Sequence, residues 1–230
     1  VPKDAENRKM FYIDATCPLV TKVHKESERH YKNGHQIILV GHKGHPEVIG
    51  TIGQLPKGSI KLIETEEDAT NLKKDEFDKP VAYVTQTTLS IDDTKNIIEI
   101  LKKKFPNIKS SIKEDICYAT TNRQNAVKQI AGNCDMFFVI GSENSSNSKR
   151  LVEVAKKSGC KRAELFDFSK KLPINEIINN KKIGLTSGAS APEKLIQDFI
   201  TEVKKHCKVS IEEIVTTEEK VTFKLPRSLS

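Results

Sequence analysis

Two histidines and a carboxylate sit close together in residues 41–47, Gly-His-Lys-Gly-His-Pro-Glu. The preceding residues, 36–40, are mostly apolar and β-branched, which is typical of a buried strand, and a helix is expected from about Glu47 to Leu55. In open α/β sheets, ligands bind where the carboxyl ends of strands lead into helices. The motif therefore predicts a site for binding or acid–base chemistry, although the same residues also suit an ordinary helix start with Pro46 in its first turn.

Two cysteines, Cys17 and Cys117, stand at expected helix N-termini. The helix dipole there stabilises a thiolate, the form that attacks electrophiles or binds metals. One such cysteine is commonly a small buried residue, but two at equivalent junctions indicate a shared chemical role. We interpret Cys134, Cys160 and Cys207 as structural. Five cysteines at wide spacings, with no Cys-x-x-Cys pair, disfavour a disulfide framework or a zinc ribbon and fit a reducing compartment.

Hydroxyl and amide side chains gather at two further helix starts. Ser145, Ser146 and Asn147 follow one apolar run, and Ser190 follows another. Helix N-termini bind anions, most often phosphate, and neither segment has the P-loop pattern. Each segment alone resembles an ordinary helix cap. Their combination with His45 predicts a phosphate site.

Strands and helices alternate along most of the chain, which is typical of parallel sheets built from βαβ units. The stretch from 209 to 223 alternates weakly and is expected to form an edge strand or a tail. Strands are expected over residues 10–14, 36–40, 60–63, 81–85, 108–112, 136–140 and 183–186; helices over 18–32, 47–55, 91–104 with a capping box from Ser90 to Asp93, 121–131, 147–157 and 193–205; and a short acidic helix capped by Thr65.

The elements fall into two halves of similar rhythm that divide near residue 113. This pattern predicts an α/β fold with two similar βαβ-type domains, each with a parallel sheet, whose junction loops face a common centre. The chain opens on polar residues at Val1 rather than on methionine, and a fragment of a longer protein is expected.

Composition limits the classes of partner. The 230 residues carry a net charge of +7, which is compatible with an anionic ligand or an acidic partner. The sequence has no arginine-rich helix, aromatic RNA platform or zinc-finger spacing, so we expect no nucleic-acid partner. No apolar run approaches the roughly 20 residues of a membrane span, so we expect no membrane partner either.

Six motifs, in the order in which the family carries them, resemble the LytB family of 4-hydroxy-3-methylbut-2-enyl diphosphate reductases. The family acts at the last step of the methylerythritol phosphate route to isoprenoids. The motifs are residues 14–24, 41–47, 85–90, 116–124, 144–148 and 187–192.

The resemblance implies a three-domain trefoil of α/β domains around a central iron–sulfur cluster. Residues 1–16 would then end a first domain that the chain lacks. Residues 17–113 would form the second α/β domain, residues 114–205 the third, and residues 206–230 a C-terminal tail.

The resemblance also implies the site. Cys17 and Cys117 would be two of the three cysteine ligands of a [4Fe-4S] cluster, with the third outside this chain. Glu47 would be the catalytic proton donor, and Thr87 its partner in positioning the substrate hydroxyl. His42, in the same loop as His45, is not expected to contact the substrate directly. The diphosphate would be bound by His45, Ser145, Ser146, Asn147 and Ser190.

The implied reaction is two-electron reductive dehydroxylation of (E)-4-hydroxy-3-methylbut-2-enyl diphosphate to isopentenyl and dimethylallyl diphosphates, with a ferredoxin-type electron donor. The alternatives are a cluster- or diphosphate-binding module without redox turnover, and a thiol enzyme that uses Cys17. The Lys/Asn-rich composition favours a plastid-type organelle such as the apicoplast, with the bacterial cytoplasm as the alternative.

Overall fold

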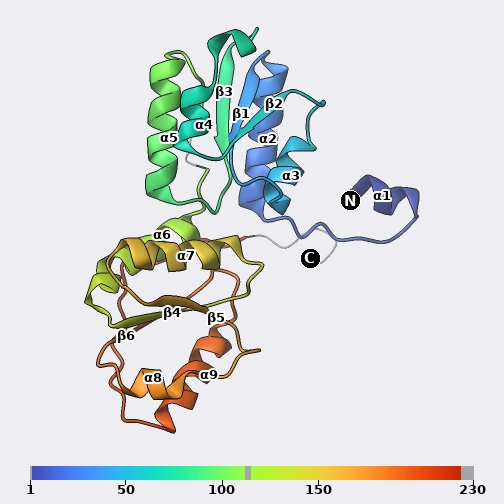
Figure 1. The fold of residues 1–230 in the computed structure, drawn as a ribbon. Coiled ribbons are helices and arrows are strands. Elements are labelled where there is room, and N and C mark those ends of the chain that lie inside the picture. The colour runs from blue at the N-terminus through green and yellow to red at the C-terminus, as the bar shows by residue number, and fades with distance from the viewer. Residues whose placement is uncertain (1, 112–114, 224–230) are drawn as a thin grey trace.

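The computed structural model describes residues 2–111 and 115–223, and it contains two parallel sheets of three strands, one in each half of the chain (Figure 1). The strand orders are β2-β1-β3 and β5-β4-β6, so the first strand of each half lies in the middle of its sheet. The predicted α/β class with two parallel sheets is confirmed. The domain boundaries at 16, 113 and 205 stay a prediction.

Helices connect the strands and cover both faces of each sheet (Figure 1). The elements are α1 (Pro2–Asn7), α2 (Pro18–Lys32), β1 (Gln36–Val40), α3 (Pro46–Ile52), β2 (Ile60–Ile63), α4 (Glu66–Asn71), the 3₁₀ turn η1 (Lys74–Glu76), β3 (Val81–Thr85), α5 (Ile91–Lys104), α6 (Tyr118–Ile130), η2 (Ala131–Asn133), β4 (Met136–Ile140), α7 (Ser146–Lys157), β5 (Ala163–Phe166), α8 (Ile174–Ile178), β6 (Ile183–Ser187) and α9 (Glu193–Lys204).

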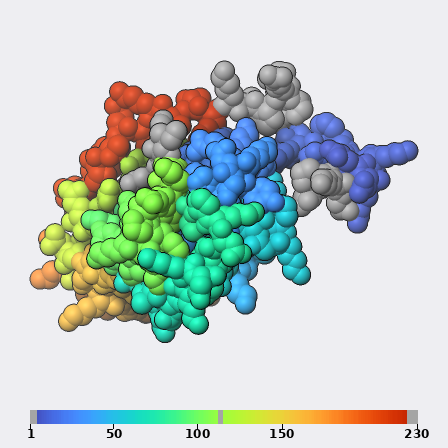
Figure 2. Space-filling view, turned by 90° about the horizontal axis from the view of Figure 1, so that it is seen from above, coloured from blue at the N-terminus to red at the C-terminus, as the bar shows by residue number. Residues whose placement is uncertain are grey.

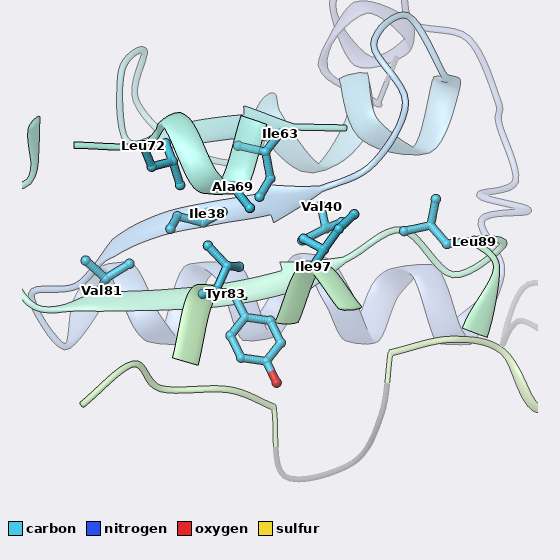
Figure 3. Close-up of a cluster of buried hydrophobic side chains, with 10 residues drawn as sticks. Ile38, Val40, Ile63, Ala69, Leu72, Val81, Tyr83, Leu89 and Ile97 are labelled. Carbon is cyan, nitrogen blue, oxygen red and sulfur yellow. The ribbon is translucent and has the colours of Figure 1, made fainter. Parts of the chain in front are cut away.

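The first sheet is hydrophobic on both faces, as expected for a parallel sheet covered by helices. Alternate residues of β1 point to opposite faces, so Ile38 packs toward α4 and α5 while Ile37 packs toward α2 and α3. Figure 3 shows the first of these two cores, in which Tyr83 of β3 and Ile97 of α5 lie on the same side as Ile38. These contacts fix the carboxyl ends of β1 and β3, from which the site loops leave.

The second sheet repeats this arrangement with larger side chains. Phe137 of β4 packs against α6 and α7, and Phe138 packs against α8 and α9. Both rings are at most 1% exposed. Truncating such a buried ring to alanine costs about 3–5 kcal/mol, so this strand anchors the second half.

The layer formed by α6 and α7 lies between the two sheets (Figure 1). Its contacts with the first half are polar. Cys117 donates its backbone N–H to the Thr87 carbonyl at 2.9 Å, and Lys157 of α7 binds the Asp93 carboxylate of α5 at 2.9 Å. None of the helices in the described ranges is both long and apolar enough to cross a membrane.

The prediction of a strand over residues 10–14 is wrong. These residues form an exposed, irregular arm that leads from α1 to α2, and the Phe11 side chain is 81% exposed (Figure 1). The arm and α1 project from the body when the molecule is seen from above (Figure 2). An apolar run forms a strand only where a neighbouring strand takes its backbone hydrogen bonds, and none lies beside this arm within the described residues.

Several element ends also differ from expectation. Helix α6 begins at Tyr118 rather than at residue 121, because Cys117 is its N-cap. Helix α3 ends at Ile52 rather than at Leu55, and β5 and α8 were not predicted.

Two expected strands do not form in the described residues. Residues 209–223 form no strand there, which leaves the alternative of a tail. The strand expected over residues 108–112 reduces to one bridge between Lys109 and Ala82, and Ile112 lies outside the described residues.

Candidate functional site

Two strand-to-helix junctions with the same local geometry carry most of the predicted site. In the first half, Gly41 follows β1 and His45 is the N-cap of α3. In the second half, Gly141 follows β4 and Ser145 is the N-cap of α7. The four residues correspond in pairs, and the two helix N-termini lie at the carboxyl edge of each sheet.

Both junctions depend on glycine because helix and strand approach too closely for a side chain. A Cβ atom on Gly41 would lie 2.7 Å from Val48 Cγ2, and one on Gly141 would lie 2.2 Å from Ser148 Oγ. A Cβ atom on Gly188, which follows β6, would also lie 2.2 Å from the Ser148 Oγ. Close packing thus places the first turn of each helix directly over the strand ends.

Glu47 is held by two hydrogen bonds from one residue. Its Oε1 accepts the Thr87 backbone N–H at 2.8 Å, and its Oε2 accepts the Thr87 hydroxyl at 3.0 Å. Burial raises the pKa of Glu47 above its ordinary value, although both hydrogen bonds from Thr87 oppose the rise. The carboxyl is therefore fixed in orientation and suited to hold a proton, as a general acid must.

His45 caps the helix that carries Glu47. Its Nδ1 lies 3.2 Å from the backbone N of Glu47 and accepts that hydrogen bond. Burial, and then the neighbouring His42, lower the pKa of His45, which favours the neutral ring. With Nδ1 accepting, the ring proton lies on Nε2, which is free to donate to an anionic ligand.

The second junction offers a set of hydrogen-bond donors around the N-terminus of α7. The Ser145 hydroxyl accepts the Ser148 backbone N–H at 3.2 Å and the Ser148 hydroxyl at 2.9 Å. Asn147 is 7% exposed, yet neither its amide nitrogen nor its amide oxygen has a hydrogen-bond partner among the residues that the structure describes. A buried amide without partners is costly in a folded protein, and a bound ligand would satisfy it.

Ser190 meets this junction across a cavity of about 230 Å³. Ser145, Ser148 and Ser190 line its polar side, and Phe166 and Leu195 line its apolar side. The structure thus brings Ser190 to the same place as Ser145, although they are far apart in sequence.

The two halves of the site meet through Ser146. Its Oγ lies 3.3 Å from the Thr88 hydroxyl and 3.4 Å from the side-chain amide nitrogen of Gln86. No direct hydrogen bond joins His45 to Ser145 or Ser190 among the described residues. Gln86 was missed at the sequence level, and its place directly after β3, beside Thr87, was the signal that could have found it.

Cys17 and Cys117 occupy equivalent positions as N-caps of α2 and α6, and within the described chain neither thiol makes a capping hydrogen bond. Burial raises the pKa of Tyr118, and the charges of Glu219, Cys117 and Cys17 contribute further. Both thiols therefore lie near the same phenol, at the meeting point of the two halves. Cys17 is exposed, as its place at the end of the N-terminal arm requires.

The other three cysteines lie apart from this centre. Cys160 is buried in the core under α7, while Cys134 and Cys207 pack against the cores at the edges of the second sheet. These positions agree with the structural interpretation.

Asp115 is a buried residue that sequence reasoning passed over. Its carboxylate accepts the Thr85 backbone N–H at 3.0 Å, the Ser111 hydroxyl at 2.8 Å and the Lys22 ammonium at 3.2 Å. Burial raises the pKa of Asp115, and these three partners oppose the rise. Asp115 thus ties the segment before Cys117 to α2 and β3.

His42 connects the two halves instead of facing the ligand donors. Its Nε2 lies 2.8 Å from an Arg150 side-chain nitrogen of α7, and its backbone N–H is accepted by the Gln86 side chain at 3.0 Å. The side chain of Arg150 also lies 3.5 Å from the Asp93 carboxylate.

The thiols fit an iron–sulfur cluster in type, since such clusters are bound by cysteine thiolates. Within the described residues, no group of three or more His, Cys, Asp or Glu side chains is gathered closely enough to hold a metal ion. The described residues thus hold no complete metal site, and the fit of Cys17 and Cys117 to such a cluster rests on their thiol chemistry and their shared N-cap position.

Together, the fold and the site describe an α/β protein in which two helix starts carry side-chain donors for an anion beside a half-buried carboxyl and two free cysteine thiols. A model of the LytB protein family matches residues 1–204, and the chain belongs to this family.

Named relatives agree along the whole chain. It is 53% identical to the 4-hydroxy-3-methylbut-2-enyl diphosphate reductase of Beijerinckia indica and 51% identical to that of Methylocella silvestris, and it spans 72% of the length of each. It is similar to the solved structure of the E-1-hydroxy-2-methyl-but-2-enyl-4-diphosphate reductase from Plasmodium falciparum, with 38% identity and a TM-score of 0.88 over 99% of this chain and 71% of that one. A second solved structure, described as (E)-4-hydroxy-3-methyl-but-2-enyl diphosphate reductase, the terminal enzyme of the non-mevalonate pathway, matches with 30% identity and a TM-score of 0.56 over 89% of this chain and 71% of that one.

Proposed function

We propose that this chain is an oxidoreductase that converts (E)-4-hydroxy-3-methylbut-2-enyl diphosphate to isopentenyl and dimethylallyl diphosphates. The observation that carries the proposal is the joint presence of a half-buried, oriented carboxyl at Glu47 and an unpartnered amide at Asn147 in equivalent places of the two halves, as far as the described residues show. The Glu47 carboxyl is suited to delivering a proton, and the Asn147 amide is suited to binding a polar ligand. The names of the relatives support this reductase over a module without turnover or a thiol enzyme that uses Cys17.

The diphosphate is bound, in this proposal, by donors from both junctions. The neutral ring of His45 donates from Nε2, and the hydroxyls of Ser145 and Ser190 face one cavity. Ser146 and the Asn147 amide add donors in the first turn of α7, where the helix dipole favours an anion. Charge-assisted hydrogen bonds of this kind hold a diphosphate without a metal ion.

The reaction consumes two protons, and Glu47 supplies the one that lets the substrate hydroxyl leave as water. Burial keeps the carboxyl protonated to a higher pH than usual, because it raises the pKa. The Thr87 hydroxyl and N–H fix its orientation, and Thr87 is also the partner that positions the substrate hydroxyl. His45 shares the loop with Glu47, so the bound diphosphate and the acid keep a fixed separation.

Cys17 and Cys117 are proposed as two ligands of a [4Fe-4S] cluster. When bound, the cluster would pass the two electrons of the reaction, one at a time, from the electron donor to the substrate. The chain's own contribution is to hold the two thiols at the N-caps of α2 and α6. A ferredoxin-type protein is the proposed electron donor, and the net charge of +7 favours docking of an acidic partner.

The cellular location is also a proposal. The relatives that share about half of their residues with this chain are bacterial, which supports the bacterial cytoplasm. The plastid-type location, an apicoplast, has the support of the Plasmodium falciparum structure at 38% identity.

The test is turnover of the diphosphate, with a chemical reductant, by anaerobically reconstituted protein that contains this chain together with the domain that carries the third cysteine ligand. We expect both isoprenoid diphosphates as products, an iron content of about four per protein as a cubane requires, and loss of activity on alkylation of the thiols. Protein that binds iron yet gives no product would contradict the reductase. Protein that binds no iron but is alkylated selectively at Cys17 would favour the thiol enzyme.

A further inference from the structure

Gln86 is a fully buried side chain that touches three polar loops. It is 0% exposed, and it directly follows β3. Its Oε1 accepts the His42 backbone N–H at 3.0 Å, and its amide nitrogen donates to the Thr88 hydroxyl at 2.8 Å and to Ser146 Oγ at 3.4 Å. One side chain therefore joins the loop that carries His45 to the N-terminus of α7.

We propose that Gln86 is a positioning residue for the diphosphate site, which orients the Ser146 hydroxyl toward the ligand and holds the two sets of donors at a fixed separation. This inference rests on the proposed function.

The orientation follows from the valence of a hydroxyl group, which has one proton to donate and two lone pairs to accept. The Gln86 amide nitrogen can only donate, so it occupies one lone pair of Ser146 Oγ at 3.4 Å, and the Thr88 hydroxyl lies 3.3 Å from the same oxygen. When the Thr88 hydroxyl donates to Ser146, the described residues offer the Ser146 proton no other acceptor. The proton is therefore available to an anion in the first turn of α7.

The second half of the molecule indicates that the fold itself does not need this glutamine. The strand register pairs Val40 with Thr85 and Ile140 with Ser187, so Gly188 stands where Gln86 stands. The backbone hydrogen bond is the same at both places: the Gln86 N–H reaches Val40 at 2.8 Å, and the Gly188 N–H reaches Ile140 at 2.9 Å. A βαβ unit of this kind therefore forms with only a glycine at this position. The Gln86 side-chain amide is needed instead for the hydrogen bonds between the two halves.

The chain supplies a matched control in Gln124 of α6. This glutamine is also 0% exposed and also crosses between the halves, since its amide donates to the Leu89 carbonyl at 2.9 Å and accepts the Ile91 N–H at 3.2 Å. It touches no proposed ligand-binding residue within the described ranges. Replacing either glutamine with methionine removes an amide of similar size from a buried boundary.

The experiment is a double-mutant cycle between Gln86→Met and Ser146→Ala, measured as the Kd of inorganic pyrophosphate and as KM for the diphosphate substrate on cluster-reconstituted protein. Loss of a buried hydrogen bond to the anion is expected to weaken binding about tenfold in each single variant, with kcat little changed. The double variant should be no weaker than about twice either single variant, because both changes remove the same interaction. Gln124→Met should lower the melting temperature and leave Kd and KM unchanged.

Independent effects that multiply in the double variant would overturn the proposal. So would a Gln86→Met protein that loses stability as Gln124→Met does while its Kd and KM stay at the wild-type values. Failure of the reductase assignment has a different signature, because wild-type protein would then give no products, while the pyrophosphate cycle would still report on Gln86.

Discussion

Glu47 and Asn147 occupy the same position in the two halves, the second residue of a helix that starts at a strand end. Glu47 receives two hydrogen bonds from Thr87, whereas the Asn147 amide has no partner within the described residues. The register places Ala189 where Thr87 stands, and alanine has no hydroxyl to donate. The same backbone thus yields a preorganised acid in one half and an unsatisfied amide in the other.

The difference shows how one junction geometry serves two chemical tasks. The glycine, the cap and the helix N-terminus recur because they follow from close packing of a helix over a strand end. The chemistry depends on the second helical residue and on what the neighbouring strand end offers it. Burial with hydrogen-bond donors fixes a carboxyl, and burial without a partner leaves an amide for a ligand.

The largest expected effect concerns the most symmetrical pair, Cys17 and Cys117. If both bind one cluster, Cys17→Ser and Cys117→Ser, made in protein that includes the third cysteine ligand, should each lower bound iron from about four per protein to below one, and abolish turnover. Cys207→Ser is the matched control, because this thiol packs at the edge of the α9 core. Iron analysis and electron paramagnetic resonance after anaerobic reconstitution make the measurement. Full iron retention in either N-cap variant would break the equivalence of the two cysteines.

The second prediction separates the acid from the anion site. Glu47→Gln should lower kcat by about 100-fold with little change in KM, since proton donation contributes roughly 10²–10⁴ in rate. Asn147→Ala should instead raise KM about tenfold with kcat little changed, as expected for loss of a ligand hydrogen bond. Steady-state kinetics on both variants decide the matter. An identical pattern in the two would show that the positions share one role.

The third prediction compares the two glycines that follow the central strands. In Gly141→Ala the new methyl group would meet the Ser148 Oγ at 2.2 Å and its Cβ at 2.7 Å, both close to the rigid helix start. In Gly41→Ala it would meet Val48 Cγ2 at 2.7 Å. Overpacking costs about 1–3 kcal/mol, and we expect the larger loss in unfolding free energy at Gly141. Gly44→Ala serves as a different control: its space is open, but its φ of +82° makes the residue strained for any side chain.

The smallest effect is the pH dependence of stability. Burial raises the pKa of Glu47, so the native state keeps this proton over a range where the unfolded chain has lost it. The stabilisation is therefore complete below the ordinary glutamate pKa of about 4.3 and is lost as pH rises through the folded pKa. Between these two pKa values, each pH unit removes about 1.4 kcal/mol from the free energy of unfolding.

Urea denaturation between acid and neutral pH measures this effect. Relative to wild type, Glu47→Gln should gain stability as pH rises. Asn147→Ala, which removes no titrating group, should differ from wild type by the same free energy at every pH. A parallel pH dependence in the two variants would contradict the burial of a protonated Glu47.

Local pattern sufficed where structure follows from neighbours in sequence. The strands at 36–40, 60–63, 81–85 and 136–140 are confirmed, because runs of buried apolar residues between helices have few other solutions. The helices 18–32 and 91–104 also form as predicted, and the Ser90 hydroxyl accepts the Asp93 N–H as half of the expected capping box.

Pattern failed where the outcome depends on distant partners. Residues 10–14 have strand-like composition, yet no strand of the described chain lies beside them. The four-residue strand β5 was missed because, unlike β2, it contains no β-branched residue, and it forms because its backbone pairs with the edge of β4.

The sequence by itself determined the α/β class, the family and the types of residue at each junction, since these depend on composition, periodicity and motif. Only the tertiary structure decided that Thr87 holds Glu47, that Asn147 is left without a partner among the described residues and that Gln86 joins the halves. Hydrogen bonds between such residues form across the ends of different strands. Their existence depends on register and burial, which no local pattern encodes.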